Sequence, residues 1–404
     1  MRVLQNIRLF ACVSHLNPAL DHSVPLLRRS SAGRNPSSLL ALRQAVAHTS
    51  KKCRLGPVML ILIPLLSSPL LAEDTATERL IQELTGRAKP VERTPEELEA
   101  AYAQTIQKLI SATEWPEVKG SPKLPLEQIV EHAGRPGAEP QRAALVRAML
   151  AHLARTEQVN ERIFLLRQLT LVGRGESVAA LAGLLKDDNL IVRQYALHAL
   201  QRNPTPEASQ AVLAILDKAE QAGWQVAVIN ALGSRREQAA VGPLAKLLDK
   251  QDQNVAEAAI MALGNIATPE AAKALAAAAA AARLPEKLRP ELTRARLLCA
   301  ERLWTRGEKD AAHALYQDVY AQTKDPLLQV AALRGLVRSK PGEALPLVLE
   351  ALRSDRPRVQ AQAARLTLDL PGAEATKALL EALPKLPPSA QALLLEALAE
   401  REKK

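Results

Sequence analysis

The sequence predicts an all-α protein, a right-handed solenoid of stacked helix pairs. Hydrophobic residues make up 48% of the chain, but aromatic residues only 2%. Ala and Leu supply most of the apolar content, and both favour helix. A core of such residues suits many thin helix–helix layers better than one large centre. The second observation is a helix–turn–helix pattern that recurs along the chain.

The recurrence is visible in the spacing of apolar residues. In four predicted helices, an apolar residue is followed by others four, five and eight positions later, which places them on one helix face. Leu200 and Leu232 lie 32 residues apart, and Leu232 and Leu263 lie 31 apart. The four sets are Val192, Ala196, Leu197, Leu200; Trp224, Val228, Ile229, Leu232; Val255, Ala259, Ile260, Leu263; and Leu328, Ala332, Leu333, Leu336.

A turn and a second helix complete each unit. The turns include NPTPE at 203–207 and ATPE at 267–270. One helix pair leaves apolar surface on both sides, so neighbouring pairs must stack to bury it. The second helices carry apolar residues at positions zero, three and four: Leu181, Leu184, Leu185; Val212, Ile215, Leu216; Leu244, Leu247, Leu248.

The segment SVAALAGLLKDDNLIVRQYALHALQ resembles the HEAT-like repeat of the phycobilisome-lyase type. An apolar second helix is followed by an Asp-containing link, Val-Arg and an Ala-rich first helix. Asp187 or Asp188 with Arg193 match this pattern, and Asp355 with Arg358 match it more loosely. The resemblance covers about 125–385 and implies a HEAT/armadillo-like superhelix, in which these residues form a structural ladder between repeats. The repeats at 222–250 and 253–282 lack the Arg.

A longer helix pair at about 286–324 interrupts the regular period. It resembles a tetratricopeptide hairpin at Gly307, Ala311, Ala312 and Tyr316. Tyr316 and Tyr320 are four residues apart and share a helix face. Together with Trp304 they are candidate contacts for a partner. The alternative is a packing variant that bends the superhelix.

We find no catalytic, cofactor or metal site in the sequence and predict no enzyme activity. Ser177 in GESVA lacks the preceding strand and following glycine of a nucleophile elbow. Cys299 has no second cysteine at zinc-binding spacing. No two histidines downstream of the leader are four residues apart, so none forms a helical metal pair; they are His132, His152, His198 and His313.

The net charge of +10 belongs mostly to the N-terminal segment. Residues 1–72 contain nine basic residues and one acidic residue, which leaves only +2 for the rest of the chain. Nucleic-acid binding places positive charge on the folded domain, so we expect no nucleic-acid partner. We therefore expect the partner to be a protein or a peptide, whose identity the sequence does not give.

The same segment predicts export. Lys51, Lys52 and Arg54 precede an apolar run that ends in small residues at Ala72, the order of a secretory signal. The run contains Pro64 and Pro69 and is short for a membrane span, so a membrane contact is expected only through an uncleaved leader. The residues before it suggest an organellar transit peptide or, as we prefer, an incorrectly assigned start. The repeats favour a bacterial, periplasmic or extracellular protein.

We therefore divide the chain into three parts. Residues 1–72 form a leader with a secretory signal at 51–72. Residues 73–124 form a helical preface and linker, and 125–404 the α-solenoid. The last helix starts near Pro387 and carries four leucines, Leu393, Leu394, Leu395 and Leu398, on a face that a terminal repeat should keep polar. This pattern suggests that the chain continues into a longer protein.

Two functions from different classes remain. The first is an exported scaffold, or the repeat module of a larger exported protein, that binds a protein or peptide without catalysis. The alternative, implied only by the family resemblance, is a lyase-like protein that handles a bilin chromophore.

We predict that the mature protein begins at Glu73, outside the cytoplasm. A leader that is removed need not match the folded domain in charge, and this one does not. Intact-mass measurement on fractionated cells that express the native gene checks this expectation. A cytosolic chain that retains Lys51 to Ala72 contradicts it.

Overall fold

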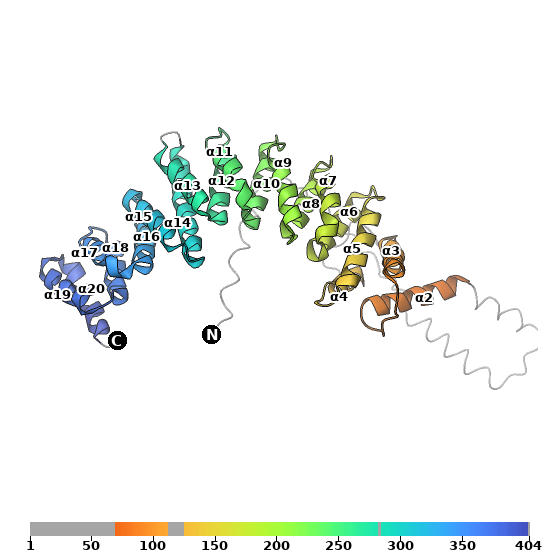
Figure 1. The fold of residues 1–404 in the computed structure, drawn as a ribbon, viewed down its shortest axis with the longest axis horizontal. Coiled ribbons are helices and arrows are strands. Elements are labelled where there is room, and N and C mark those ends of the chain that lie inside the picture. Colours follow the sequence, from red (N-terminus) through yellow and green to blue (C-terminus); the bar gives the residue numbers. More distant parts are fainter. Residues whose placement is uncertain (1–68, 112–124, 282–283, 403–404) are drawn as a thin grey trace, which may run out of the picture. The chain divides into compact units, whose positions relative to one another are not determined.

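The computed structural model describes residues 69–111, 125–281 and 284–402, where all regular structure is helical (Figure 1). By internal contacts the chain divides into 1–72 and 73–404, and the second unit holds nearly all the helices. The α-helices are α2 (Pro69–Leu84), α3 (Pro95–Ser111), α4 (Pro125–Ala133), α5 (Glu139–Leu153), α6 (Val159–Val172), α7 (Gly175–Leu184), α8 (Leu190–Arg202), α9 (Pro206–Leu216), α10 (Ala222–Arg235), α11 (Val241–Leu247), α12 (Gln253–Ile266), α13 (Pro269–Ala280), α14 (Arg289–Thr305), α15 (Lys309–Gln322), α16 (Pro326–Ser339), α17 (Leu345–Leu352), α18 (Pro357–Leu366), α19 (Ala373–Ala382) and α20 (Pro388–Arg401).

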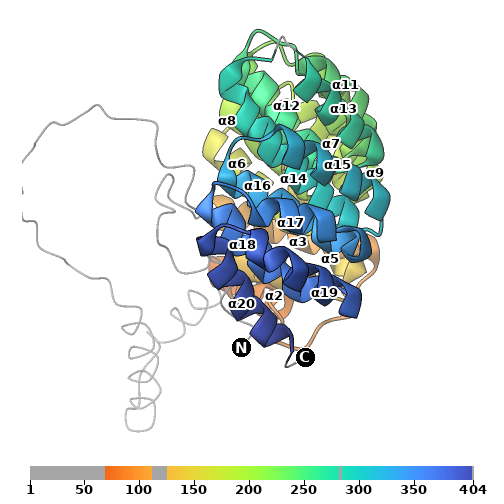
Figure 2. The ribbon, with the colours of Figure 1, turned by 90° about the vertical axis from the view of Figure 1, so that its left-hand side faces the viewer.

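The helices of 73–404 stack in chain order in two layers. In the even layer each helix from α6 to α20 packs against the next even-numbered helix. In the odd layer α3, α5, α7 and α9 pack in succession, as do α11, α13 and α15, and then α17 and α19. Figure 2 shows α16, α18 and α20 on one side and α13, α9 and α19 on the other. The predicted all-α solenoid of helix pairs is confirmed.

The core lies between the two layers and contains the predicted apolar stripes. Of the residues in the seven sets, all are buried except Leu184 and Leu328, which are partly exposed. The buried side chains form two clusters, one extending to Leu336 in α16 and one from Leu333 in α16 to Leu398 in α20. The core is therefore a series of thin Ala/Leu layers, as the composition suggested.

Short polar side chains start the helices. Asn189, Asp252 and Asp325 accept hydrogen bonds from backbone N–H groups in the first turns of α8, α12 and α16, at 2.8–3.3 Å. Such a cap contributes about 1 kcal/mol. At α3, Glu97 N–H donates to Thr94 Oγ1 and the Glu97 carboxylate accepts from Thr94 N–H, which completes a capping box.

The ends of the described chain differ in part from expectation. Leu394 and Leu398 are buried and Leu393 is partly buried, so only Leu395 of the four leucines of α20 is largely exposed. Most of the predicted secretory signal, and the linker at 112–124, lie outside the described residues. Ala72 lies within α2. In the described ranges no helix has the length and apolar character needed to cross a bilayer.

Consecutive even-numbered helices approach one another at glycine. A Cβ on Gly233 of α10 would lie 2.8 Å from Cα of Ala262 in α12, and one on Gly264 of α12 would lie 2.8 Å from the carbonyl oxygen of Ala295 in α14. Both contacts involve backbone atoms, which cannot rotate away. These two glycines therefore set the spacing of α10, α12 and α14.

We predict that Gly264→Ala destabilises the protein by about 1–3 kcal/mol, the usual cost of overpacking a core. The matched control is Gly183→Ala in α7, where a Cβ meets nothing within 4 Å. That change should stabilise by about 0.5–1 kcal/mol, because Ala is the better helix former. Urea unfolding followed by circular dichroism measures both. Equal shifts in the same direction would contradict the close-packing argument.

Candidate peptide-binding site

Tyr316, predicted to contact a partner, is a core residue. It is 2% exposed, and its ring lies on Gly335 of α16, where a Cβ would be 2.4 Å from Cδ1. Its hydroxyl donates to Glu301 Oε2 at 2.9 Å. Burial, and then the hydrogen bond to Glu301, raise the pKa of Tyr316. The side chain joins α14, α15 and α16 and is not available to a partner.

Trp304 and Tyr320 also take part in packing. The Arg338 guanidinium lies over the Trp304 ring, with Cζ 3.9 Å from the ring centroid, and also forms an ion pair with Glu301. Such a cation–π contact contributes about 0.5–1 kcal/mol at exposed sites. Tyr320 is partly buried and packs against both core clusters. These positions fit the packing alternative better than a binding step.

Asp187 links two successive repeats. It accepts hydrogen bonds from the Arg162 guanidinium in α6 and, at 2.9 Å, from the Asn189 N–H. Arg193, predicted to pair with Asp187, lies instead over the Trp224 ring of the next repeat, with Cζ 5.4 Å from the centroid. Arg162 and Arg193 occupy the fourth position of α6 and α8. The ladder thus runs from each of these positions to the following repeat.

The looser match at Asp355 and Arg358 forms no such pair. Both residues are exposed and make no ion pair or side-chain hydrogen bond within the described residues. Arg356 donates instead to Gln329 Oε1 of α16 at 2.7 Å. The repeat contact is retained here, but different residues of the link supply it.

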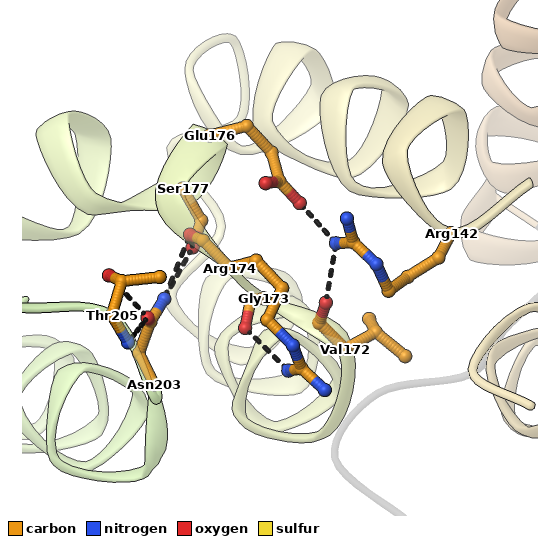
Figure 3. A network of polar contacts seen from close by, with 8 residues as sticks. All are labelled: Arg142, Val172, Gly173, Arg174, Glu176, Ser177, Asn203 and Thr205. Carbon is orange, nitrogen blue, oxygen red and sulfur yellow. Dashed lines mark hydrogen bonds and ion pairs between the residues drawn. The ribbon is translucent and has the colours of Figure 1, made fainter. Parts of the chain in front are cut away.

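Polar side chains also connect the turns at the other edge of the stack (Figure 3). Arg142 in α5 donates to the Val172 carbonyl at 3.0 Å and forms an ion pair with Glu176. Asn203 donates to the Arg174 carbonyl at 2.8 Å and to Ser177 Oγ at 3.3 Å. Ser177 is fully buried in this network, so its hydroxyl serves the turn.

Arginines from later repeats continue the pattern. Arg235 at the end of α10 donates to the carbonyls of Leu200 at 2.6 Å and Thr205 at 2.8 Å, in the α8–α9 turn. Arg401 of α20 contacts the carbonyls of Thr367 and Gly372 in the same way. These bonds satisfy carbonyl groups that a helix end leaves without partners.

A hollow lies on the even layer, between α4, α6 and α8. It has a volume of about 620 Å³, in the range of ligand-binding pockets. Gln168 at its floor is 4% exposed, and its amide has no hydrogen-bond partner among the described residues. Leu171, which is 62% exposed, and the half-buried Tyr195 add apolar surface. The lining is Glu127, Val130, Glu131, Gly134, Arg167, Gln168, Thr170, Leu171, Val172, Tyr195 and His198.

The sequence contains a feature at Gln168 that the spacing of apolar residues did not reveal. In α8, α10, α12 and α16 the residue directly before the last stripe leucine is small, at Ala199, Ala231, Ala262 and Gly335. Gln168 occupies this position before Leu169 in α6. A polar amide at a position that is Ala or Gly in these four helices is the departure that marks the hollow.

Two further observations concern metal binding and the reactivity of the thiol. No group of three or more His, Cys, Asp or Glu residues suited to a metal ion is found in the described part of the chain. His198 lies on the rim of the hollow, where partial burial and then the charge of Arg202 lower its pKa. Cys299 is fully buried, and burial raises the pKa of its thiol to about 12.

Two layers of sequentially stacked helix pairs define an α-solenoid. The chain matches a family model described as HEAT repeats over residues 146–224 and 210–289, which span α5 to α13. Residues 146–289, less than half of the chain, are therefore similar to HEAT repeats. No curated protein matches the chain significantly.

Several solved structures are similar to the chain at low identity. Human deoxyhypusine hydroxylase in complex with glycerol is 15% identical, with a TM-score of 0.31, covering 67% of this chain and 100% of that one. Importin beta is 11% identical with a TM-score of 0.42, covering 92% and 58%. The karyopherin Kap121p bound to the extreme C-terminus of the phosphatase Cdc14p is 12% identical with a TM-score of 0.40, covering 90% and 45%. The chain spans about half the length of importin beta and Kap121p. Identities and TM-scores this low carry no argument about function.

Asp187 gives a pH-dependent prediction. Partial burial opposes ionisation, but the hydrogen bonds from Arg162 and Asn189 and the charges of Arg162 and Arg193 bring the pKa of Asp187 below its usual value. The stabilisation is therefore present at neutral pH and is lost as pH falls through this lowered pKa. We expect Asp187→Asn to cost about 1–2 kcal/mol at neutral pH, and the difference from wild type to shrink as pH falls below the ordinary aspartate pKa of 3.8.

The matched control is Asp188→Asn, because Asp188 is exposed and has no side-chain partner in the described residues. Urea midpoints across the pH range measure both variants. An equal cost for Asp188→Asn, or a difference that does not change with pH, would count against the ladder.

Proposed function

We propose that the protein is a non-catalytic scaffold that binds an extended protein segment in the hollow between α4, α6 and α8. The observation that carries the proposal is the Gln168 amide, which lines the hollow without a hydrogen-bond partner in the described residues, although the residue as a whole is only 4% exposed. The amide is open to the hollow, so a ligand can reach it. A bound ligand can supply its hydrogen-bond partner.

The amide favours a peptide as the ligand. A glutamine side chain donates and accepts, so it can match the N–H and C=O of an extended backbone. Leu171 and Tyr195 provide apolar surface beside it for an anchoring side chain. A segment with one apolar anchor and a free backbone edge suits this arrangement of groups.

The location and context of the scaffold form a further part of the proposal. The basic and apolar leader supports export, and a module of a larger exported protein is consistent with the repeats. The phycobilisome-lyase type of repeat and the tetratricopeptide hairpin remain proposals based on the resemblance. The bilin-handling alternative gains no support from the described residues, and we do not propose it.

The test uses the full chain and a displayed peptide library. We expect enrichment of peptides with one apolar anchor, and Gln168→Ala should weaken the selected peptide about two- to tenfold, the value of one hydrogen-bonding group. Ala is the residue at this position in α8, α10 and α12, so the fold accommodates the smaller side chain there.

Leu171→Ala should also weaken the peptide. The matched control is Leu380→Ala in α19, because Leu380 is 53% exposed and lies outside the hollow. Fluorescence polarisation gives the dissociation constants. An affinity that does not change in Gln168→Ala, or falls equally in Leu380→Ala, would rule out this site.

A further inference from the structure

Three arginines gather at the turn edge of α10, α12 and α14. Arg236 is the C-cap residue of α10 and is exposed. Arg302, near the end of α14, donates to the Asn265 carbonyl at 2.8 Å and to its Oδ1 at 3.0 Å. Arg306, the C-cap residue of α14, donates to the Ala267 carbonyl at 2.8 Å. Two of the three are thus fixed on the end of α12.

The close helix packing brings these groups together. Gly233 allows α10 to lie against Ala262 of α12, and Gly264 allows α12 to lie against Ala295 of α14. The pKa of Arg302 is lowered by partial burial and then by the charges of Arg236 and Arg306, as expected for cations within electrostatic reach.

No carboxylate balances this cluster among the described residues. Glu237, next to Arg236, accepts a hydrogen bond from the Ala239 N–H at 3.0 Å and lies near Arg235. Glu270, at the start of α13, interacts with Thr268 and Lys273. The Arg236 side chain makes no hydrogen bond or ion pair with any described residue. Arg302 and Arg306 therefore have only backbone and amide oxygens as partners, and Arg236 has none among the described residues.

The backbone of Arg236 is a second departure from the ordinary. It adopts the left-handed conformation, with φ 57° and ψ 43°. Glycine is the usual residue at such a C-cap, and a residue with a Cβ costs roughly 1–2 kcal/mol there. Strain of this kind concentrates at functional positions. Ala267, the C-cap of α12, adopts the same conformation with φ 53°, so both strained caps lie at this edge and only Arg236 adds a long cationic side chain.

We propose that Arg236, Arg302 and Arg306 form a binding site for an acidic peptide segment. Carboxylates suit guanidinium groups, which donate two parallel hydrogen bonds. A peptide fits better than nucleic acid, because residues 73–404 carry a net charge of only +2. The site lies on α10 and α14, apart from the hollow on α4, α6 and α8. It does not depend on binding in that hollow.

The test measures binding of a short, fluorescein-labelled peptide rich in Asp and Glu to the full chain. We expect Arg236→Asn to weaken binding about two- to fivefold, the value of one exposed ion pair, and to lower its salt dependence. Asn tolerates the left-handed backbone, so the fold is retained. The double variant Arg236→Asn/Arg306→Gln should lose on the order of tenfold.

The matched control is Arg353→Asn. Arg353 is also an exposed helix C-cap residue, at the end of α17, and has no side-chain partner in the described residues. Its replacement should leave the affinity unchanged. Equal losses in both single variants, no loss in Arg236→Asn, or equally tight binding of a Ser/Asn-rich peptide would overturn the proposal. So would a single-stranded oligonucleotide that binds more tightly and loses affinity in the same variant.

Discussion

The close approach of consecutive even-numbered helices is the constraint on which the structure depends. With aromatic residues at only 2%, no large side chains span wide gaps, so contact must come from short distances between backbones. Small residues at the contact points permit this, as Gly233 does against Ala262 and Gly264 against Ala295. The thin Ala/Leu core and the regular period follow from the same requirement.

Polar groups at both edges keep the repeats in register. At the turn edge, Asn203 and Arg235 bind carbonyl groups that would otherwise have no partner. At the opposite edge, Arg162 pairs with Asp187. Each such bond joins a side chain of one repeat to the backbone or link of a neighbour. Dispersion in the core is not directional, so these bonds decide how one pair sits on the next.

Both proposed sites arise where a residue departs from the repeat. Gln168 occupies a position that is Ala or Gly in α8, α10, α12 and α16, and its amide is left for a ligand. Arg236 occupies a left-handed C-cap, as Ala267 does at the end of α12, but its side chain is long, cationic, exposed and without a partner in the described residues. A repeat protein satisfies its fold with the common residues, so such exceptions are candidate binding positions.

The sequence by itself determined the helix-pair solenoid, the apolar faces and the capped helix starts, because the spacing of Val192 to Leu200 and the Thr94–Glu97 box are local patterns. Only the tertiary structure decided which side chains meet across repeats. Asp187 pairs with Arg162, 25 residues earlier, and Tyr316 is enclosed by Gly335 of another helix. Helical periodicity fixes the face of a residue but not what packs against that face. The hollow beside Gln168 and the arginine cluster at Arg236 therefore became visible only once the layers were stacked.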